Sequence, residues 1–221
     1  MMLKARVTLR WISIISLSIL GASAAGAAES DDKAELLIQK MKQVVADPGR
    51  YAEAVKRGEQ RVVLCQYCHG KNGISKRDNI PNLAAQHVEY LIRQFELFAD
   101  QGRVDPVMSE LATTLSDEER INVALYYSSQ PPGPGHRYDE GDKNIGKKIY
   151  HDQCAACHGQ EGYGNDQYPR IAGQQGRYLV RTLARYRSDE HLRPNSPMQA
   201  IAKPLTNEQI KSLAAYISGL K

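Results

Sequence analysis

Two short motifs contain all four cysteines of this 221-residue chain. Each motif places two residues between its cysteines and a histidine directly after the second cysteine. This C-x-x-C-H spacing is typical of covalent haem attachment, because the two thiols can bond the vinyl-derived carbons of one haem while the adjacent imidazole binds its iron. The sequence therefore predicts two haem c groups, one held by Cys65, Cys68 and His69, the other by Cys154, Cys157 and His158.

Two other roles for the four cysteines remain open at this point. They could form one four-cysteine zinc site, or they could form a pair of disulfides. The motifs start 89 residues apart (154 − 65), which is a wide separation for the two halves of a zinc ribbon. A histidine directly after the second cysteine in both copies favours haem over either alternative.

A haem iron held by one histidine needs a second ligand or keeps an open position. Met108 follows His69 by 39 residues and Met198 follows His158 by 40, so both methionines occupy matching places and are predicted as iron ligands. Histidine–methionine ligation closes the iron and raises its reduction potential relative to two histidines. We therefore expect electron transfer, with no catalytic residue and no small-molecule substrate. An open iron, or one held by another histidine, is the alternative at each site.

The remaining candidate ligands have no counterpart between the two halves of the chain. Met41 precedes the first motif and is interpreted as a helix-packing residue. For the other histidines we expect surface or hydrogen-bonding roles: His87, His136, His151 and His191.

The elements that must position these side chains occur twice, at offsets of 88 to 90 residues. Helical periodicity predicts helices near residues 31–46, 51–64, 87–100 and 116–129, followed by a second set in the same order. Ser116–Glu119 and Thr206–Gln209 are capping boxes that open the last helix of each repeat. The sequence thus predicts an all-α fold built from a duplicated domain.

Two further pairs of residues at matching positions suggest how each repeat is held together. Gly58 and Gly146 precede their motifs within predicted helices, where glycine is costly unless another helix packs closely, and Tyr126 and Tyr216 are the expected partners. Pro81 and Pro169 follow the motifs, and their carbonyls are candidate acceptors for the second N–H of the ligating histidines. The alternative is that each proline only shapes its loop.

The first 28 residues resemble an export signal, which predicts a periplasmic protein. Lys4, Arg6 and Arg10 precede a short apolar segment and small residues suited to cleavage. An uncleaved membrane anchor is the alternative. The predicted division of the chain is a signal at 1–28, a helical extension at 29–50, a first domain at 51–130, a Pro/Gly linker at 131–137 and a second domain at 138–221.

Composition and charge limit the function further. The predicted mature chain contains two phenylalanines and no tryptophan, so a haem would supply much of the core of each small domain. Residues 29–135 carry 13 basic and 16 acidic side chains, whereas residues 136–221 carry 13 and 9, which gives net charges of −3 and +4. The basic residues form no stripe with aromatic residues, so nucleic acid is not an expected partner.

Each repeat resembles a class I cytochrome c, with its glycine before the motif, C-x-x-C-H-G, a Pro-x-hydrophobic-Ala segment, a methionine and a capped last helix. Two such repeats after an export signal resemble the cytochrome c4 family. The resemblance implies two tandem class I cytochrome c domains, each wrapped around one covalent haem and facing each other with propionates near the interface. It also implies redox-protein partners, namely a membrane-bound donor complex and a terminal oxidase.

Two alternatives resemble this chain in having two haems. One is the dihaem subunit of a flavocytochrome c sulfide dehydrogenase, whose partner is a flavoprotein. The other is a dihaem oxidoreductase such as a thiosulfate dehydrogenase. That enzyme family uses a cysteine as a distal iron ligand, and the four cysteines here leave none for that role.

Overall fold

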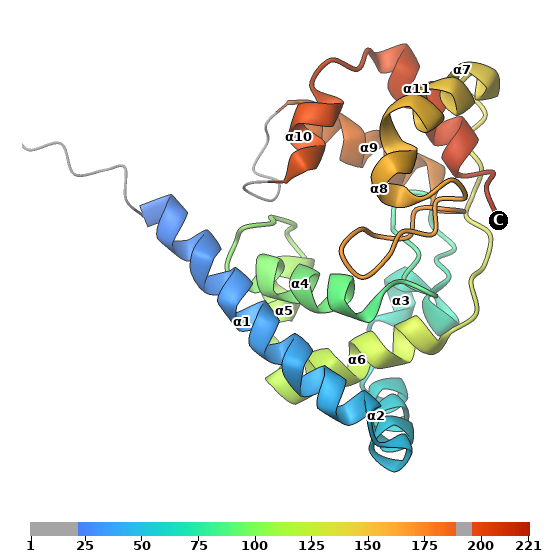
Figure 1. Ribbon diagram of the computed structural model, residues 1–221. Helices are drawn as coiled ribbons and strands as arrows, with labels where there is room; N and C mark the ends of the chain where they lie inside the picture. Colours follow the sequence, from blue (N-terminus) through green and yellow to red (C-terminus); the bar gives the residue numbers. More distant parts are fainter. Residues whose placement is uncertain (1–21, 189–195) are drawn as a thin grey trace, which may run out of the picture.

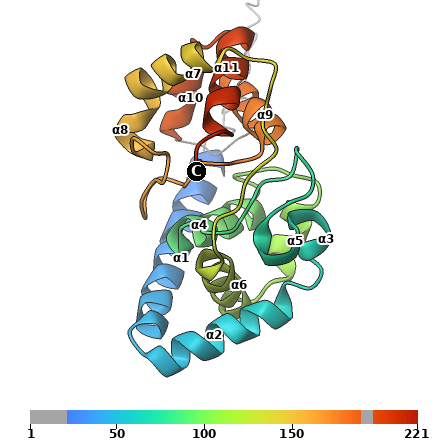
Figure 2. The same ribbon diagram turned by 90° about the vertical axis from the view of Figure 1, so that its right-hand side faces the viewer.

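The computed structural model describes residues 22–188 and 196–221, which form helices and loops divided into two lobes (Figures 1 and 2). The first lobe contains α1 (Ala22–Val45), α2 (Pro48–Arg61), α3 (Gln66–His69), the 3₁₀ turn η1 (Lys71–Gly73), α4 (Val88–Ala99), α5 (Met108–Thr114) and α6 (Asp117–Ser129). The second contains α7 (Lys143–Ile149), the π-helical turn η2 (Tyr150–Cys154), α8 (Ala155–His158), α9 (Gly176–Arg187), α10 (Pro197–Ala202) and α11 (Asn207–Ile217). The all-α prediction is confirmed.

The same close crossing of two helices builds each lobe. A Cβ atom on Gly58 of α2 would lie 2.1 Å from the carbonyl oxygen of Asn122 and 2.7 Å from the Cβ of Tyr126 in α6. A Cβ atom on Gly146 of α7 would lie 2.0 Å from the carbonyl oxygen of Ser212 in α11. The predicted role of both glycines is confirmed, because any side chain there would push apart the helices that precede and follow the haem motif.

Both predicted capping boxes are also present. The Ser116 hydroxyl accepts from the backbone of Glu119, whose carboxylate accepts from the backbone of Ser116 in return. Thr206 and Gln209 make the same exchange at the start of α11. These reciprocal bonds satisfy N–H groups that the first helical turn leaves unpaired, and they fix where the last helix of each lobe begins.

Helix α1 is part of the core of the first lobe. It lies along α4 and also contacts α2 and α6 (Figure 1). Leu37, Ile38 and Met41 are at most 5% exposed and join the main apolar cluster of this lobe. The interpretation of Met41 as a packing residue is therefore confirmed. An apolar stripe at helical spacing must be covered somewhere, and here the first domain covers it.

The predicted export signal lies outside the described residues as far as residue 21, and residues 22–28 form the start of α1. Within the described ranges, the helices include none with the length and apolar character needed to cross a membrane. The chain between α6 and α7 runs in extended form along one side of the molecule (Figure 2).

Each lobe has its own apolar cluster, and tyrosines supply much of the aromatic packing. Tyr126 and Tyr127 are buried in the first lobe, and Tyr138, Tyr150 and Tyr186 in the second. The chain has few Phe and Trp, and its tyrosines add aromatic surface to both clusters, because a tyrosine ring can be buried where its hydroxyl finds a polar neighbour. Tyr150, for example, donates to the carbonyl oxygen of Gly159 over 2.6 Å.

Candidate haem-binding site

The two C-x-x-C-H motifs adopt matching backbone conformations. Each ends in a single helical turn, α3 or α8, and each turn is closed by a glycine with positive φ, +78° at Gly70 and +79° at Gly159. Glycine takes this left-handed conformation without the steric cost of a Cβ atom. The turn and its glycine place the histidine of each motif at the start of the loop that leads back to the lobe core.

His69 and His158 are buried and held at the same ring atom. The Nδ1 atom of His69 lies 2.9 Å from the carbonyl oxygen of Pro81, and that of His158 lies 3.0 Å from the carbonyl oxygen of Pro169. Because a carbonyl can only accept, Nδ1 must carry the proton in both rings. The proposed role of the two prolines is confirmed, and Nε2 is left with a lone pair suited to a metal.

The charge state of both histidines suits the same role. Burial lowers the pKa of His69 and of His158, outweighing the bond to the proline carbonyl, which raises it. Both rings are therefore neutral at pH 7. Neutral imidazole is the form that binds a metal through its free nitrogen, with the other N–H donated to a carbonyl.

The two predicted methionine ligands begin short helices, rather than lying in loops. The backbone N–H of Met108 donates to Oδ1 of Asp105 over 3.1 Å at the start of α5. The Ser196 side chain caps α10, with Pro197 at its first position and Met198 at its second. In each case a nearby side-chain oxygen accepts from the backbone N–H of the methionine, so its side chain projects from a defined point.

One continuous cavity of about 410 Å³ connects the two sets of predicted ligands. His69 and Met108 line it from the first lobe, and His158 and Met198 line it from the second. Its remaining walls are largely apolar and come from both lobes: Leu83, Leu91, Phe95, Phe98, Ile171, Leu179, Leu183, Leu213 and Ile217. The structure therefore brings all four predicted axial ligands to one apolar space between the lobes.

These features fit haem and disfavour the other roles considered for the cysteines. The four cysteines form no disulfide with one another, so the disulfide alternative is wrong. Among the described residues, no three Cys, His, Asp or Glu side chains come together as a metal-ion site, so the zinc site is not formed. Apolar walls with a neutral imidazole and a thioether provide what a haem needs, and Cys68 and Cys154 lie on the same walls.

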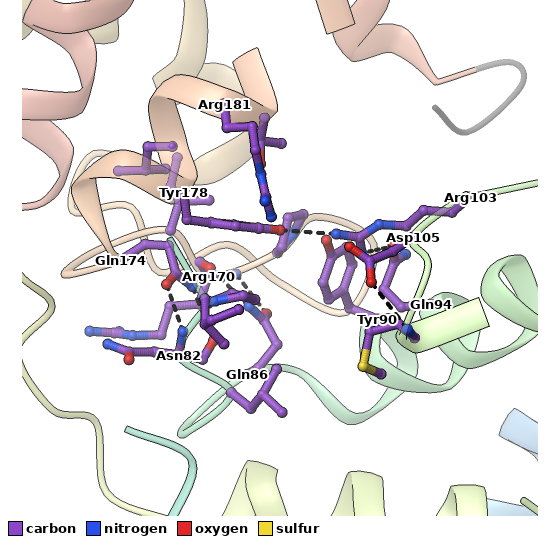
Figure 3. Close-up of a pocket in the computed structure, with 18 of the residues that line it drawn as sticks. Asn82, Gln86, Tyr90, Gln94, Arg103, Asp105, Arg170, Gln174, Tyr178 and Arg181 are labelled. Carbon is purple, nitrogen blue, oxygen red and sulfur yellow. Dashed lines mark hydrogen bonds between the residues drawn. The ribbon is translucent and has the colours of Figure 1, made fainter. Parts of the chain in front are cut away.

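One side of the cavity is polar and carries Arg103 and Arg181, with Asp105 beside Arg103 (Figure 3). The guanidinium of Arg103 donates to Oε1 of Gln94 over 2.7 Å and to the hydroxyl of Tyr178 over 3.1 Å, which joins the two lobes. It also lies 4.4 Å above the Phe98 ring. Arg181 extends from α9 on the same side (Figure 3). These cations are the groups that would pair with haem propionates.

The spare histidines take part in hydrogen bonds, as expected. His87 lies 2.7 Å from the carbonyl oxygen of Tyr163 in the opposite lobe, and His136 and His151 contact Oε1 of Gln175 and Gln160. His191 lies outside the described residues. The sequence reasoning missed a set of polar residues between the lobes, although two of them, Gln86 and Gln174, stand at matching positions 88 residues apart (174 − 86).

Comparison with known proteins agrees with this site. A sequence model described as cytochrome c matches residues 144–221. Cytochrome c4 of Thiocapsa roseopersicina is 31% identical over 169 residues, covering 71% of this chain and 87% of that protein. A protein of Stutzerimonas stutzeri described as a thiosulfate dehydrogenase electron acceptor is 27% identical over 171 residues, covering 72% and 79%.

Among solved structures, reduced recombinant cytochrome c4 from Pseudomonas stutzeri matches with a TM-score of 0.69 and 30% identity. The match covers 76% of this chain and 98% of that one, so both lobes take part. Two haem motifs, a shared apolar cavity and a relative above 30% identity over most of its length agree with one another. The chain therefore belongs to the cytochrome c4 family, whose members carry two haem c groups and transfer electrons.

Proposed function

We propose that this protein is a periplasmic electron carrier that takes single electrons from a membrane-bound donor complex and passes them to a terminal oxidase. Each iron is held by a histidine and a methionine, His69 with Met108 and His158 with Met198. The thiols of Cys65, Cys68, Cys154 and Cys157 form the covalent bonds to the two haems. The boundaries given above for the signal, the extension, the two domains and the linker belong to the same proposal.

The observation that carries this proposal is the equivalent arrangement at the two iron sites. In each lobe a neutral histidine is held at Nδ1 by a proline carbonyl, and a methionine in the first turn of a short helix lines the same cavity. Haem iron with both axial positions filled carries one electron as it cycles between ferric and ferrous states. The protein's own part is to keep the ligands in place and to exclude water, which favours electron transfer over substrate chemistry.

The sulfur-to-iron charge-transfer band of the ferric protein tests the ligands. We expect the intensity of two methionine-ligated haems, and Met108→His or Met198→His should each remove about half of it and lower one potential. Rapid carbon monoxide binding by the unmodified reduced protein would show an open iron and would contradict the proposal.

A second candidate partner follows from the relative described as a thiosulfate dehydrogenase electron acceptor. On that basis the electron donor would be a sulfur-oxidising enzyme, and this chain would remain the carrier. Stopped-flow reduction by a thiosulfate dehydrogenase, compared with reduction by a quinol-oxidising membrane complex, distinguishes the two donors. Purification of the native protein tests the remaining alternative, since a flavocytochrome subunit would come with its flavoprotein.

A further inference from the structure

Two glutamines reach across the interface between the lobes to matching peptide groups. Gln174, just before α9, accepts from the backbone N–H of Asn82 over 2.7 Å and donates to the carbonyl oxygen of Asn82 over 3.0 Å. Gln86, just before α4, accepts from the backbone N–H of Arg170 and donates to its carbonyl oxygen, both over 2.9 Å. Figure 3 shows both pairs beside the cavity.

The symmetry of this exchange extends to the neighbouring atoms. Oε1 of Gln174 also accepts from the N–H of Gln175, and Oε1 of Gln86 also accepts from the N–H of His87. Gln86, Gln174 and Asn82 are all buried, at 6–8% exposed. Two independent surfaces meeting by chance would not place the same side chain on the same backbone atoms in both directions, so the repeat itself defines this contact.

The peptide groups involved are the ones that hold the predicted iron ligands. The N–H of Asn82 belongs to the peptide bond whose carbonyl, on Pro81, accepts from Nδ1 of His69. The N–H of Arg170 belongs to the peptide bond whose carbonyl, on Pro169, accepts from Nδ1 of His158. Each chain of hydrogen bonds therefore runs from a histidine in one lobe, through a single peptide group, to a glutamine in the other.

We propose that Gln86 and Gln174 are positioning residues that adjust the reduction potential of the haem in the opposite lobe. A peptide group whose N–H donates becomes a stronger acceptor at its carbonyl, because linked hydrogen bonds polarise one another. A stronger acceptor at Nδ1 makes Nε2 of the histidine a stronger donor to iron. Stronger donation stabilises the ferric state, so each glutamine lowers the potential of the haem across the interface.

The same link works in both directions. Because the coupling is a free energy, ferric iron at His69 strengthens the bond to Gln174 as much as that bond stabilises the ferric iron. The contact between the lobes is thus tighter at the oxidised haem. This inference rests on the proposed ligand roles of His69 and His158.

The test is a spectroelectrochemical titration of the full two-haem protein and of Gln174→Leu, with Met108→His in each background to identify the first-lobe wave. Gln174→Leu should shift the wave of the His69 haem to more positive potential and leave that of the His158 haem in place. Gln86→Leu should do the reverse. The crossed pattern is the essential result, because local damage would alter the haem in the substituted residue's own lobe.

Gln175→Leu is the matched control. Gln175 is fully buried at the same interface, and its side-chain amide donates across it to the carbonyl oxygen of Ser75 and to Oδ1 of Asn82, both over 2.8 Å, but it bonds neither proline peptide. Gln175→Leu should weaken the interface without shifting the reduction potential of the haem in the opposite lobe. Shifts confined to the same lobe, equal shifts of both waves, or no shift beyond the control would overturn the proposal.

A second measurement covers the case in which Gln174→Leu fails to retain haem. Gln174→Met keeps an unbranched side chain without the amide, and the Nδ1–H resonance of ¹⁵N-labelled His69 in the reduced protein should move upfield while that of His158 stays. An unmoved His69 resonance would overturn the proposal. Failure of the ligand assignment is separate, since the wild-type charge-transfer band would then be absent before any glutamine is changed.

Discussion

The two lobes share one fold but place different side chains at matching buried positions between their helices. In the first lobe Arg120 of α6 forms a buried ion pair with Glu96 of α4, and both side chains are at most 5% exposed. In the second lobe the position that matches Arg120 is Ile210, counted from the two capping boxes, and the position that matches Glu96 is Ala184, counted from Tyr90 and its equivalent Tyr178. Ile210 is 1% exposed and belongs to the apolar cluster of the second lobe, so an apolar side chain stands where the first lobe has the buried arginine.

The ion pair also reaches the segment that carries the predicted methionine ligand. Arg120 donates to the carbonyl oxygen of Ala112 in α5 over 2.8 Å, and Lys33 of α1 lies 3.4 Å from Glu96. The Arg120–Glu96 ion pair thus links four helices, α1, α4, α5 and α6. The comparison indicates that the two lobes keep the same backbone around the haem motifs. The buried side chains that pack the helices around each motif differ between the lobes, so they can be altered separately.

The largest effect should come from the haem attachments. In Cys154→Ala/Cys157→Ala the second lobe should lose its haem, and its helices should lose much of their order because the cavity wall would have no partner. Cys65→Ala/Cys68→Ala should leave more helix in the first lobe, since α1 and the ion pair remain. Haem staining of a denaturing gel and far-UV circular dichroism measure both effects. Loss of all haem from the wild type in acidified solvent would show that attachment is not covalent.

Breaking the ion pair should have the next largest effect, and only on the first lobe. Arg120→Met leaves the Glu96 carboxylate buried without its main partner, which should cost about 3–5 kcal/mol of unfolding free energy. The double variant Glu96→Leu/Arg120→Met should recover most of this loss, because apolar groups pack well in place of a buried pair. Ile210→Met is the control in the second lobe, with an expected cost below about 1.5 kcal/mol. Denaturant unfolding followed at the haem bands measures all three, and equal losses in Arg120→Met and Ile210→Met would contradict the comparison.

A smaller effect should show whether α1 belongs to the first lobe. Ile38 is fully buried, so Ile38→Val should lower the unfolding free energy by about 0.5–1.5 kcal/mol. Leu36→Ala on the same helix is the control, because Leu36 is 58% exposed and should change stability by no more than about 0.5 kcal/mol. No residue of α1 lines the cavity within the described part of the chain, so both haem spectra should stay unchanged. An altered spectrum would mean that α1 influences the first haem.

The smallest expected effect concerns the two potentials. The lobes differ in side-chain charge, −3 against +4, and directly after the proline that holds the histidine the first lobe has Asn82 where the second has Arg170. Burial lowers the pKa of Arg170, yet arginine stays protonated at neutral pH. Positive charge disfavours the ferric form, so the haem on Cys154 and Cys157 should have the higher potential.

Arg170→Gln tests that order by a redox titration and should lower the second-lobe potential. Lys147→Gln, at an exposed position on α7, is the control, since surface charge is screened within about 8–10 Å at physiological salt. A single wave with identical potentials would contradict the inequality. A higher potential at Cys65 and Cys68 would contradict the charge argument.

The sequence alone determined the haem motifs, the duplication, the last helix of each repeat and the two glycines at the helix crossings. These features depend on residues close together in the chain or on spacing that recurs, and such patterns are visible without coordinates. The role of the Pro81 and Pro169 carbonyls as acceptors could also be predicted, because a ligating histidine needs an acceptor for its second N–H and a proline occurs at matching positions in both repeats.

Only the tertiary structure decided how the two lobes meet. Gln174 and Asn82 lie 92 residues apart in the chain, and neither residue type by itself suggests a contact. The Glu96–Arg120 ion pair could not be predicted from the sequence either, because charged residues are usually solvent-exposed and only the structure shows that these two are buried. The packing of α1 on the first lobe required the same information, because an apolar stripe shows that a helix is covered and leaves open what covers it.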